Sequence, residues 1–214
     1  MVQKRAFIVS FEGIEACGKS TQFKMLCNFL RKKKIKFLSF SEPGSTKVGK
    51  VIRNLLLDPK FKLFPLTEAL LFMACRTQLL KEKVIPNLNK AQIILFDRYI
   101  DSTLAYQFLS QNTQIDFKTA LNLVKKFSFG ILPDLTFVLD ISLYLSLKRK
   151  KDKDRFFKKS LNFHAKVRKA YKELAKIFPK RIVILNALKS REELFKEILE
   201  ILSKRCNVFM NFNL

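Results

Sequence analysis

Eight residues near the N-terminus have the types and spacing of a loop that binds phosphate. They are Gly13-Ile14-Glu15-Ala16-Cys17-Gly18-Lys19-Ser20. The two glycines let the backbone curl around an anion, so that N–H groups and a helix N-terminus point at phosphate oxygens. Lys19 adds a positive charge, and Ser20 offers a hydroxyl to Mg²⁺. The spacing therefore predicts a nucleotide phosphate site, and the alternative is a loop that binds no nucleotide.

The next candidate residues stand at the end of a later apolar run. Asp97 directly follows the run 93–96, and a carboxylate at the end of a buried strand can hold Mg²⁺ or its water shell. An alternative role for Asp97 is the N-cap of the helix that follows, and the two roles are compatible. Arg98 comes next, and its planar guanidinium can bind a phosphate through two N–H groups.

Two further segments offer groups to a second ligand. Pro43 and Gly44 mark a turn after a predicted strand, next to Glu42, and a plain loop is the alternative. Phe72 and Arg76 are four residues apart on a predicted helix and share one face. There a ring can stack on a base and a guanidinium can bind a phosphate. The simpler interpretation of Phe72 is packing in the core.

The remaining candidates each permit two interpretations. The basic run 148–155 is either a solvated helix face or a mobile lid that closes over a nucleotide and supplies a cation. His164, the only histidine, has no neighbours with metal-ligand spacing, so we predict a structural role for it. Cys17 lies beside Lys19 and a predicted helix N-terminus, an arrangement that can lower a thiol pKa and make it reactive. The alternative for Cys17 is a small inert filler.

These residues need elements that bring them together, and the pattern of the chain predicts such elements. Short apolar runs predict strands at 6–11, 36–41, 92–97, 134–140 and 181–186. Helices are predicted at 19–33, 47–57, 66–89, 98–112, 116–129, 142–151, 158–177 and 190–204. This alternation predicts an α/β fold with a parallel sheet covered on both faces. The loops 12–18, 41–46 and 97–103 should converge beyond the carboxyl ends of the strands. We expect the tail after Lys204 to be loosely packed.

Composition limits the class of protein. A length of 214 residues with 48% hydrophobic residues predicts one domain with a substantial core. No run reaches ~18 consecutive apolar residues, and the first residues lead directly into a predicted strand. We therefore expect neither a membrane span nor a signal peptide. The four cysteines lack C-x-x-C spacing, which argues against a disulfide scaffold or zinc site and favours a reducing cytoplasm.

The net charge of +24 is the second unusual feature of the chain. Binding to nucleic acid is one explanation. The basic residues are spread through predicted helices rather than gathered in one arm, which favours a solvated lysine surface. Positive charge would also steer anionic substrates toward a site.

Taken together, the motifs resemble those of thymidylate kinases of the bacterial type, over about residues 5–186. The resemblance rests on residues 11–21, Glu42-Pro43-Gly44, Asp97-Arg98-Tyr99 with 102–107, Pro133-Asp134-Leu135 with Leu139-Asp140, and Asp154-Arg155-Phe156. The most specific part is Asp-Arg-Tyr followed by Ser-Thr-x-Ala-Tyr-Gln. That spacing separates thymidylate kinases from other nucleoside monophosphate kinases.

The resemblance implies a fold and a reaction. The fold would be a three-layer α/β/α P-loop NTPase fold with a five-stranded parallel sheet and a short helical lid at about 148–157. One kinase domain would span 1–205, with a tail at 206–214. The reaction would be direct in-line phosphoryl transfer from ATP, with Mg²⁺, to dTMP, giving dTDP for dTTP biosynthesis. A homodimer in the cytoplasm would fit the family, and we expect no membrane or nucleic-acid partner. The alternatives are another nucleoside or nucleotide monophosphate kinase and, more remotely, a nucleic-acid-binding ATPase.

The resemblance also implies roles for individual residues. The catalytic group would be Lys19, Asp97, Arg98 and Arg155, with Ser20 and Asp97 at the metal. ATP would be bound by Gly13, Ile14, Glu15, Ala16, Cys17, Gly18, Lys19, Ser20, Thr21 and Arg149. The acceptor would be bound by Glu15, Glu42, Pro43, Arg53, Phe72, Arg76, Arg98, Thr103, Tyr106 and Gln107.

Within the acceptor set, the resemblance separates the parts of dTMP. Glu15 would contact the sugar 3′-hydroxyl, and Tyr106 would pack near the deoxyribose. The phosphate would be held by three arginines, Arg53, Arg76 and Arg98. Phe72 would stack on thymine. The base edge would be recognised by Thr103 and Gln107.

Some positions depart from the family pattern. Ser41 stands where the family often has arginine, Phe108 where glycine is common, and Phe157 where glutamate is usual. Ala16 and Cys17 occupy loop positions where one branch of the family has arginine. The catalytic cation would then come from the lid, with Arg155 or Arg149 as candidates.

Overall fold

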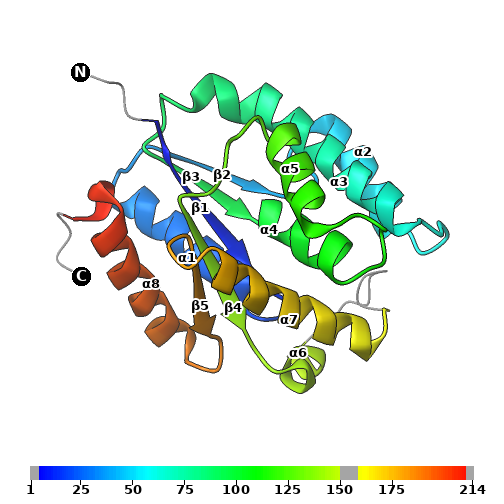
Figure 1. Ribbon diagram of the computed structural model, residues 1–214. Helices are drawn as coiled ribbons and strands as arrows, with labels where there is room; N and C mark the ends of the chain where they lie inside the picture. The colour runs from blue at the N-terminus through cyan, green and yellow to red at the C-terminus, as the bar shows by residue number, and fades with distance from the viewer. Residues whose placement is uncertain (1–4, 150–158, 211–214) are drawn as a thin grey trace.

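A five-stranded parallel sheet forms the centre of the computed structural model, which describes residues 5–149 and 159–210 (Figure 1). The strands are β1 (Phe7–Glu12), β2 (Phe37–Ser41), β3 (Ile93–Asp97), β4 (Leu135–Asp140) and β5 (Ile182–Asn186). Their spatial order is β2-β3-β1-β4-β5, and all neighbouring pairs are parallel. Each strand lies within one residue of its predicted bounds, so the predicted α/β sheet is confirmed.

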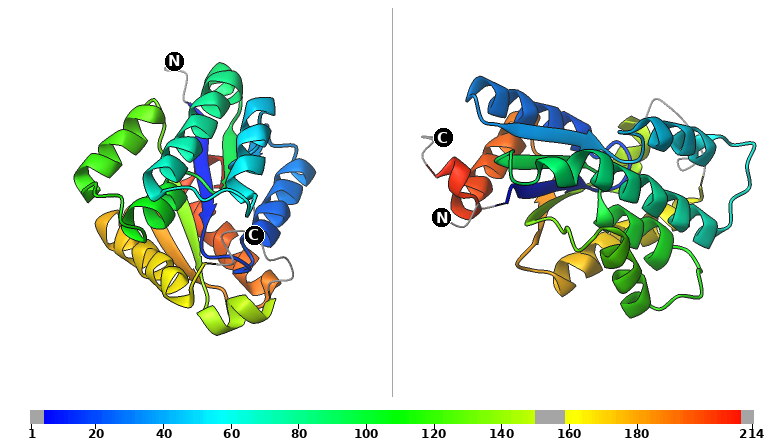
Figure 2. Two further views of the ribbon diagram at one scale, coloured as in Figure 1. Left: turned by 90° about the vertical axis from the view of Figure 1, so that its right-hand side faces the viewer. Right: turned by 90° about the horizontal axis from the view of Figure 1, so that it is seen from above.

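Two helical layers cover the sheet. Helices α1 (Lys19–Lys32) and α8 (Arg191–Arg205) pack together on one face (Figure 2). The other face carries α3 (Pro65–Leu79), α5 (Phe117–Phe127) and α7 (Leu161–Ile177), with α2 (Lys47–Leu57) packed against α3. Because both faces are covered, the central strands are almost entirely buried and are mostly apolar, with a few buried polar residues such as Glu12.

Strand register explains how distant loops meet at one place. Asp97 at the end of β3 pairs with Phe11 of β1 and with Ser41 of β2. The three strands therefore end in one row, and the loops that follow them leave the same edge of the sheet. The predicted convergence of these loops is confirmed, and it follows from the parallel order of the strands.

Two predicted helices differ from the structure. The predicted helix 66–89 is α-helical only to Leu79; a π-helical turn, Leu80–Val84, and a short 3-10 turn, Ile85–Asn87, follow. Pro86 has no N–H to donate to the carbonyl four residues earlier, so it prevents an α-helix from resuming after the π-helical turn. The predicted helix 98–112 begins only with α4 (Ile100–Thr103) and continues as a π-helical segment, Leu104–Leu109. Arg98 is excluded from it because its φ is 69°, in the left-handed region.

The prediction of a loosely packed tail after Lys204 is wrong for its first residues. Cys206 and Phe209 are buried, and residues Asn207–Phe209 form a short 3-10 turn. The Phe209 ring stacks on Phe29 of α1, with a centroid separation of 6.1 Å. Burial of the large Phe209 ring against the core stabilises this part of the tail, although polar residues lie close to it in the sequence.

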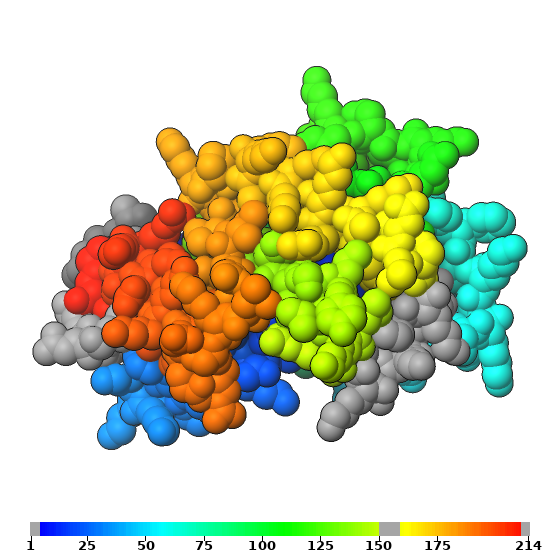
Figure 3. Space-filling view, turned by 90° about the horizontal axis from the view of Figure 1, so that it is seen from below, coloured from blue at the N-terminus to red at the C-terminus, as the bar shows by residue number. Residues whose placement is uncertain are grey.

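The predicted lid lies mostly outside the described residues. Helix α6 (Leu143–Arg149) leads up to it and packs against α7, and both are visible from below the molecule (Figure 3). Phe157 and Arg155 also lie outside the described residues.

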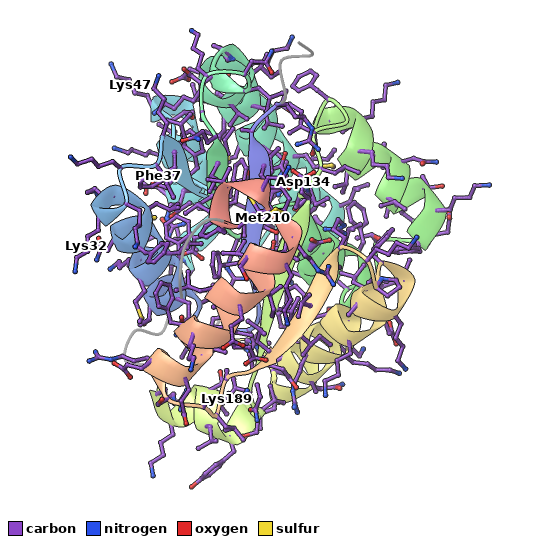
Figure 4. All side chains as sticks on the ribbon, turned by 90° about the vertical axis from the view of Figure 1, so that its left-hand side faces the viewer. Lys32, Phe37, Lys47, Asp134, Lys189 and Met210 are labelled. Carbon is purple, nitrogen blue, oxygen red and sulfur yellow. The ribbon has the colours of Figure 1, made fainter. Side chains whose placement is uncertain are left out.

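Exposed lysines are spread widely over the molecule. Lys32, Lys47 and Lys189 are exposed and come from separate parts of the surface (Figure 4). These three lysines do not form a cluster, which agrees with a solvated lysine surface. No helix within residues 5–149 and 159–210 is long and apolar enough to cross a membrane.

Candidate active site

The phosphate-binding loop joins β1 to α1 in the conformation that its glycines permit. Gly13 and Gly18 have φ values of 138° and 95°. A Cβ at Gly13 would lie 2.7 Å from the Leu139 carbonyl oxygen, so the loop backbone needs glycine there. Gly18 begins α1 without a side-chain cap, which leaves N–H groups of the first turn for an anion.

Lys19, Ser20 and Asp97 come together at the carboxyl edge of the sheet. Ser20 Oγ donates to Asp97 Oδ2 at 2.8 Å, and Lys19 Nζ lies 3.6 Å from Asp97 Oδ1. A hydroxyl and a carboxylate side by side are oxygen donors of the kind that Mg²⁺ prefers. Among the described residues, no group of three or more acidic, histidine or cysteine side chains could hold a metal. Mg²⁺ in nucleotide sites usually takes its remaining ligands from water and phosphate oxygens.

Glu15 and Arg98 form a second charged centre beside the loop. Arg98 Nη2 donates to Glu15 Oε1 at 3.3 Å and to the Tyr106 hydroxyl at 3.2 Å, and Tyr106 donates to Glu15 Oε1 at 2.8 Å. His164 Nδ1 lies 3.5 Å from the other oxygen of Glu15. Burial alone would raise the pKa of Glu15, but the close contact with His164, the charge of Arg98 and the Tyr106 hydroxyl together lower it. Glu15 is therefore held as an anion.

Arg98 owes its position to a buried acid behind it. Glu12 accepts hydrogen bonds from the Tyr99 N–H and from the Ser102 hydroxyl, which in turn accepts from Arg98 Nη1. Arg98 also donates to the Gly13 carbonyl oxygen at 3.1 Å. These bonds fix the left-handed backbone at Arg98 and direct its guanidinium toward the phosphate-binding loop.

Arg76 and Arg53 extend from α3 and α2 to the loop after β2. Arg76 donates to Glu42 Oε2 and to Thr103 Oγ1, while Arg53 Nη1 donates to the Pro43 carbonyl oxygen at 2.9 Å. Arg76 Nη1 is buried and has no partner among the described residues. The helices thus bring two guanidinium groups to the loop after β2, Arg53 from the helix that directly follows the loop and Arg76 from 34 residues beyond Glu42.

These groups surround one cavity of about 610 Å³. It is lined by Glu15, Ala16, Lys19, Ser20, Ser41, Glu42, Pro43, Gly44, Ser45, Lys50, Arg53, Leu57, Phe72, Arg76, Asp97, Arg98, Tyr99, Ser102, Thr103, Tyr106 and Gln107. All the predicted acceptor-binding residues belong to this lining. Only part of the predicted ATP-binding set lines the cavity. The residues of that set outside the lining are Gly13, Gly18, Ile14, Cys17, Thr21 and Arg149. Arg149 Nη1 donates to the Ala187 carbonyl oxygen at 3.5 Å.

The hypothesis of a reactive Cys17 is wrong. Its side chain is 1% exposed, and burial raises the pKa of the thiol despite the nearby Lys19. Cys17 Sγ would lie 2.9 Å from a Cβ at Gly13, so it fills space behind the loop. The structure supports the alternative that Cys17 is a small inert filler. Burial disfavours the thiolate more strongly than the nearby helix N-terminus favours it.

Several side chains in or beside the site had no predicted role there, and Tyr99 of the cavity lining is one of them. Lys50 and Leu57 line the cavity and share a face of α2 with Arg53, so helical spacing from Arg53 is a signal that finds them. Ser102 belongs to the motif that carries the resemblance, but no role was predicted for it. His164 contacts Glu15 across the fold, and no local pattern in the sequence indicates that contact.

Comparison with known proteins shows which family this chain resembles. The family model described as thymidylate kinase matches residues 11–198. A thymidylate kinase of Thermoanaerobacter sp. (strain X514) is 39% identical over 198 residues, 92% of this chain and 97% of that protein. One from Acholeplasma laidlawii (strain PG-8A) is 39% identical over 203 residues, 92% of this chain and 98% of that protein. A crystal structure of thymidylate kinase from Ehrlichia chaffeensis superposes with a TM-score of 0.76 at 27% identity. It covers 94% of this chain and 99% of that one.

Proposed function

This chain belongs to the thymidylate kinase family, and we propose that the cavity of about 610 Å³ binds dTMP against the phosphate-binding loop for transfer of a phosphoryl group from ATP. The reaction is the ATP-dependent phosphorylation of dTMP to dTDP. The observation that carries the assignment of the site is the cavity itself, which joins the phosphate loop to Phe72, Thr103 and Gln107. The phosphate loop and these three side chains line the same space, as a transfer between two nucleotides requires.

The donor end of the site is formed by the loop and Asp97. Backbone N–H groups between Gly13 and Ser20 bind the ATP phosphates, and Lys19 stabilises negative charge that develops during transfer. Ser20 and Asp97 hold Mg²⁺, which supplies further charge neutralisation when bound. Phosphoryl transfer depends on positioning and charge more than on covalent chemistry, so this set needs no nucleophilic side chain.

The acceptor end is formed by α2, α3 and the segment after β3. Arg98, Arg76 and Arg53 bind the phosphate of dTMP, and Arg76 Nη1 is a buried donor that has no partner among the described residues. Phe72 stacks on the base. Glu15, held as an anion by Arg98 and Tyr106, accepts from the sugar 3′-hydroxyl.

We propose that a cation from the lid stabilises the transferred phosphoryl group. The loop carries Ala16 and Cys17 rather than arginine, so we assign the cation that faces the transferred group to Arg155 or Arg149. Arg155 lies outside the described residues, and Arg149 ends α6 next to that segment. Lid closure would also exclude water from the reacting phosphoryl group.

We also propose a homodimer. Helices α2 and α3 pack together and expose the apolar side chains Val48, Val51, Leu66 and Leu70. Several exposed apolar groups on adjacent helices are typical of a protein interface. Sedimentation equilibrium should give twice the chain mass, and Val51→Lys with Leu70→Lys should give the monomer. A monomer at all concentrations would refute the proposal.

A cytoplasmic location is proposed on the state of the cysteines. All four are free thiols and buried, which suits a reducing compartment. Fractionation of cells followed by immunodetection tests it, and recovery outside the cytoplasmic fraction would contradict it.

The function is tested by a coupled assay of the purified chain with Mg-ATP and dTMP, dUMP, UMP, CMP or AMP. We expect dTMP to give the highest kcat/KM, with turnover of ~1–100 s⁻¹. Absence of turnover with dTMP, or faster turnover of CMP or AMP, would refute the assignment. Nucleic acid should leave the rate of ATP hydrolysis unchanged.

A further inference from the structure

Glu68 on α3 is a buried carboxylate one helical turn before Phe72. It lies behind the cavity lining, and its side chain is 1% exposed. A buried charge is costly unless neighbouring groups satisfy it. Among the partners of Glu68 within the described residues are Gln107, Gln111 and Lys159.

The contacts around Glu68 leave little freedom. Gln107 Nε2 donates to Glu68 Oε1 at 3.0 Å, and Gln111 Nε2 donates to the same oxygen at 2.9 Å. Lys159 Nζ lies 3.4 Å from both carboxylate oxygens and donates to Gln111 Oε1 at 2.9 Å. The lysine thus stabilises the buried negative charge, and it also fixes the second glutamine.

This arrangement decides which end of the Gln107 amide faces the cavity. An ionised carboxylate only accepts hydrogen bonds, so Gln107 must turn its Nε2 toward Glu68. A turned amide would set a carbonyl oxygen against the carboxylate and lose a charge-assisted hydrogen bond. The carbonyl oxygen Oε1 is therefore left as the group that Gln107 offers to a ligand. No described residue donates to it.

The geometry points to Glu68, supported by Lys159, as a positioning residue that makes Gln107 an acceptor for the base edge of the nucleotide. The inference rests on the proposed binding of dTMP in this cavity. Thymine carries a hydrogen at N3 and so donates there, whereas N3 of cytosine accepts. Thr103 Oγ1 accepts from Arg76, so its own hydrogen remains available for a base carbonyl. Gln107 thus offers an acceptor for the N3–H of thymine. Thr103 offers a donor for a carbonyl oxygen of the same base.

The test compares dTMP with dCMP in the wild type and in Glu68→Gln. The measured quantity is the Ki of dCMP divided by the KM of dTMP, which needs no turnover of dCMP. An amide at position 68 allows either orientation of Gln107, so the ratio should fall about tenfold or more. The KM for ATP should stay within twofold. A ratio within twofold of the wild type would overturn the inference.

Glu82→Gln is the matched control. Glu82 also accepts from a glutamine on the same stretch of helix, Gln78, but it does not line the cavity. It should leave the ratio unchanged. An equal fall of the ratio in this control would overturn the inference, because it would show an indirect effect.

Two further variants keep the test decisive if Glu68→Gln folds poorly. Lys159→Met removes the cation from a partly exposed position, and the ratio should fall several-fold. In Glu68→Gln/Gln107→Glu an oxygen of the carboxylate faces the cavity in either rotamer, so preference for dTMP over dCMP should return. Unchanged preference in Lys159→Met, or no recovery in the double variant, would overturn the inference. Failure of the proposed function is distinguishable, because the wild type itself would then not phosphorylate dTMP.

Discussion

Arg76 and Glu42 form a buried ion pair in which two guanidinium nitrogens donate to a single carboxylate oxygen, at 2.9 and 2.7 Å. Both side chains are almost fully buried, at 2% and 4% exposed. The pair joins α3 to the loop after β2, and Thr103 accepts a third hydrogen bond from Arg76. One contact therefore links the helix that carries Phe72 to the two segments that form the rest of the acceptor pocket.

Removal of one partner of this pair should be costly. Glu42→Leu leaves the Arg76 charge buried and unpaired, so the free energy of unfolding should fall by about 3–5 kcal/mol. The double variant Glu42→Leu/Arg76→Met should recover much of that loss, because neither charge remains. Urea unfolding measures both. A loss below about 1 kcal/mol in the single variant would contradict the expected role of the pair.

Lys19→Ala should abolish most of the activity and keep the fold. Lys19 Nζ is close to Asp97 and lines the cavity, and Lys19 is not part of the hydrophobic core cluster. Loss of one positioned charge typically lowers kcat by about 10²–10³. The coupled assay and thermal unfolding measure the two effects. Lys24→Ala, an exposed lysine on the same helix, is the control and should retain activity.

Gly13→Ala should damage the phosphate-binding loop, whereas Gly130→Ala should not. A Cβ at Gly13 would meet the Leu139 carbonyl oxygen at 2.7 Å and Cys17 Sγ at 2.9 Å, and its φ is +138°. At Gly130 nothing lies within 4 Å, so the cost is only that of a left-handed alanine, about 1–2 kcal/mol. Activity and thermal stability should both separate the two variants. Equal losses of activity would contradict a steric need for glycine in the loop.

The stability of the protein should depend on pH through Glu12. Burial, with the nearby charge of Asp101, raises the pKa of Glu12 from 4.5 to about 7. Between about pH 4.5 and pH 7 the folded protein holds a proton that the unfolded chain has lost. The contribution of Glu12 to stability therefore falls as the pH rises through this window and is level above it.

Glu12→Gln isolates that contribution, because the amide does not titrate. Its free energy of unfolding relative to the wild type should rise by up to about 3 kcal/mol between pH 5 and pH 8. Urea unfolding at several pH values measures the difference in free energy of unfolding between Glu12→Gln and the wild type. The contributions of the other titrating groups cancel in this difference. A difference that stays constant over this range would show that Glu12 is ionised throughout.

Cys17 should resist alkylation in the folded protein. It is buried and its thiol pKa is raised, so little thiolate is exposed at neutral pH. Iodoacetamide followed by peptide mass spectrometry should show far slower modification at Cys17 in buffer than in urea. Comparable rates in both solutions, with a slower rate when ATP is bound, would restore the hypothesis of a reactive thiol.

Contiguous features were predictable because they depend on neighbours along the chain. The phosphate loop is eight consecutive residues whose chemistry and backbone freedom are set by type and spacing. The strand before Asp97 is an apolar run whose burial follows from an α/β alternation. The resemblance then extended these motifs to the residues of the acceptor pocket, all of which line the cavity.

The contacts that fix the site were decided only by tertiary structure. Glu68 meets Lys159 although they are 91 residues apart, and Glu15 meets His164 from another element of the fold. Cys17 has the neighbours of a reactive thiol, but packing behind Gly13 makes it inert. Such outcomes depend on how helices and strands pack against one another. A local pattern determines what a side chain can do, whereas packing determines which partner it meets and whether water reaches it.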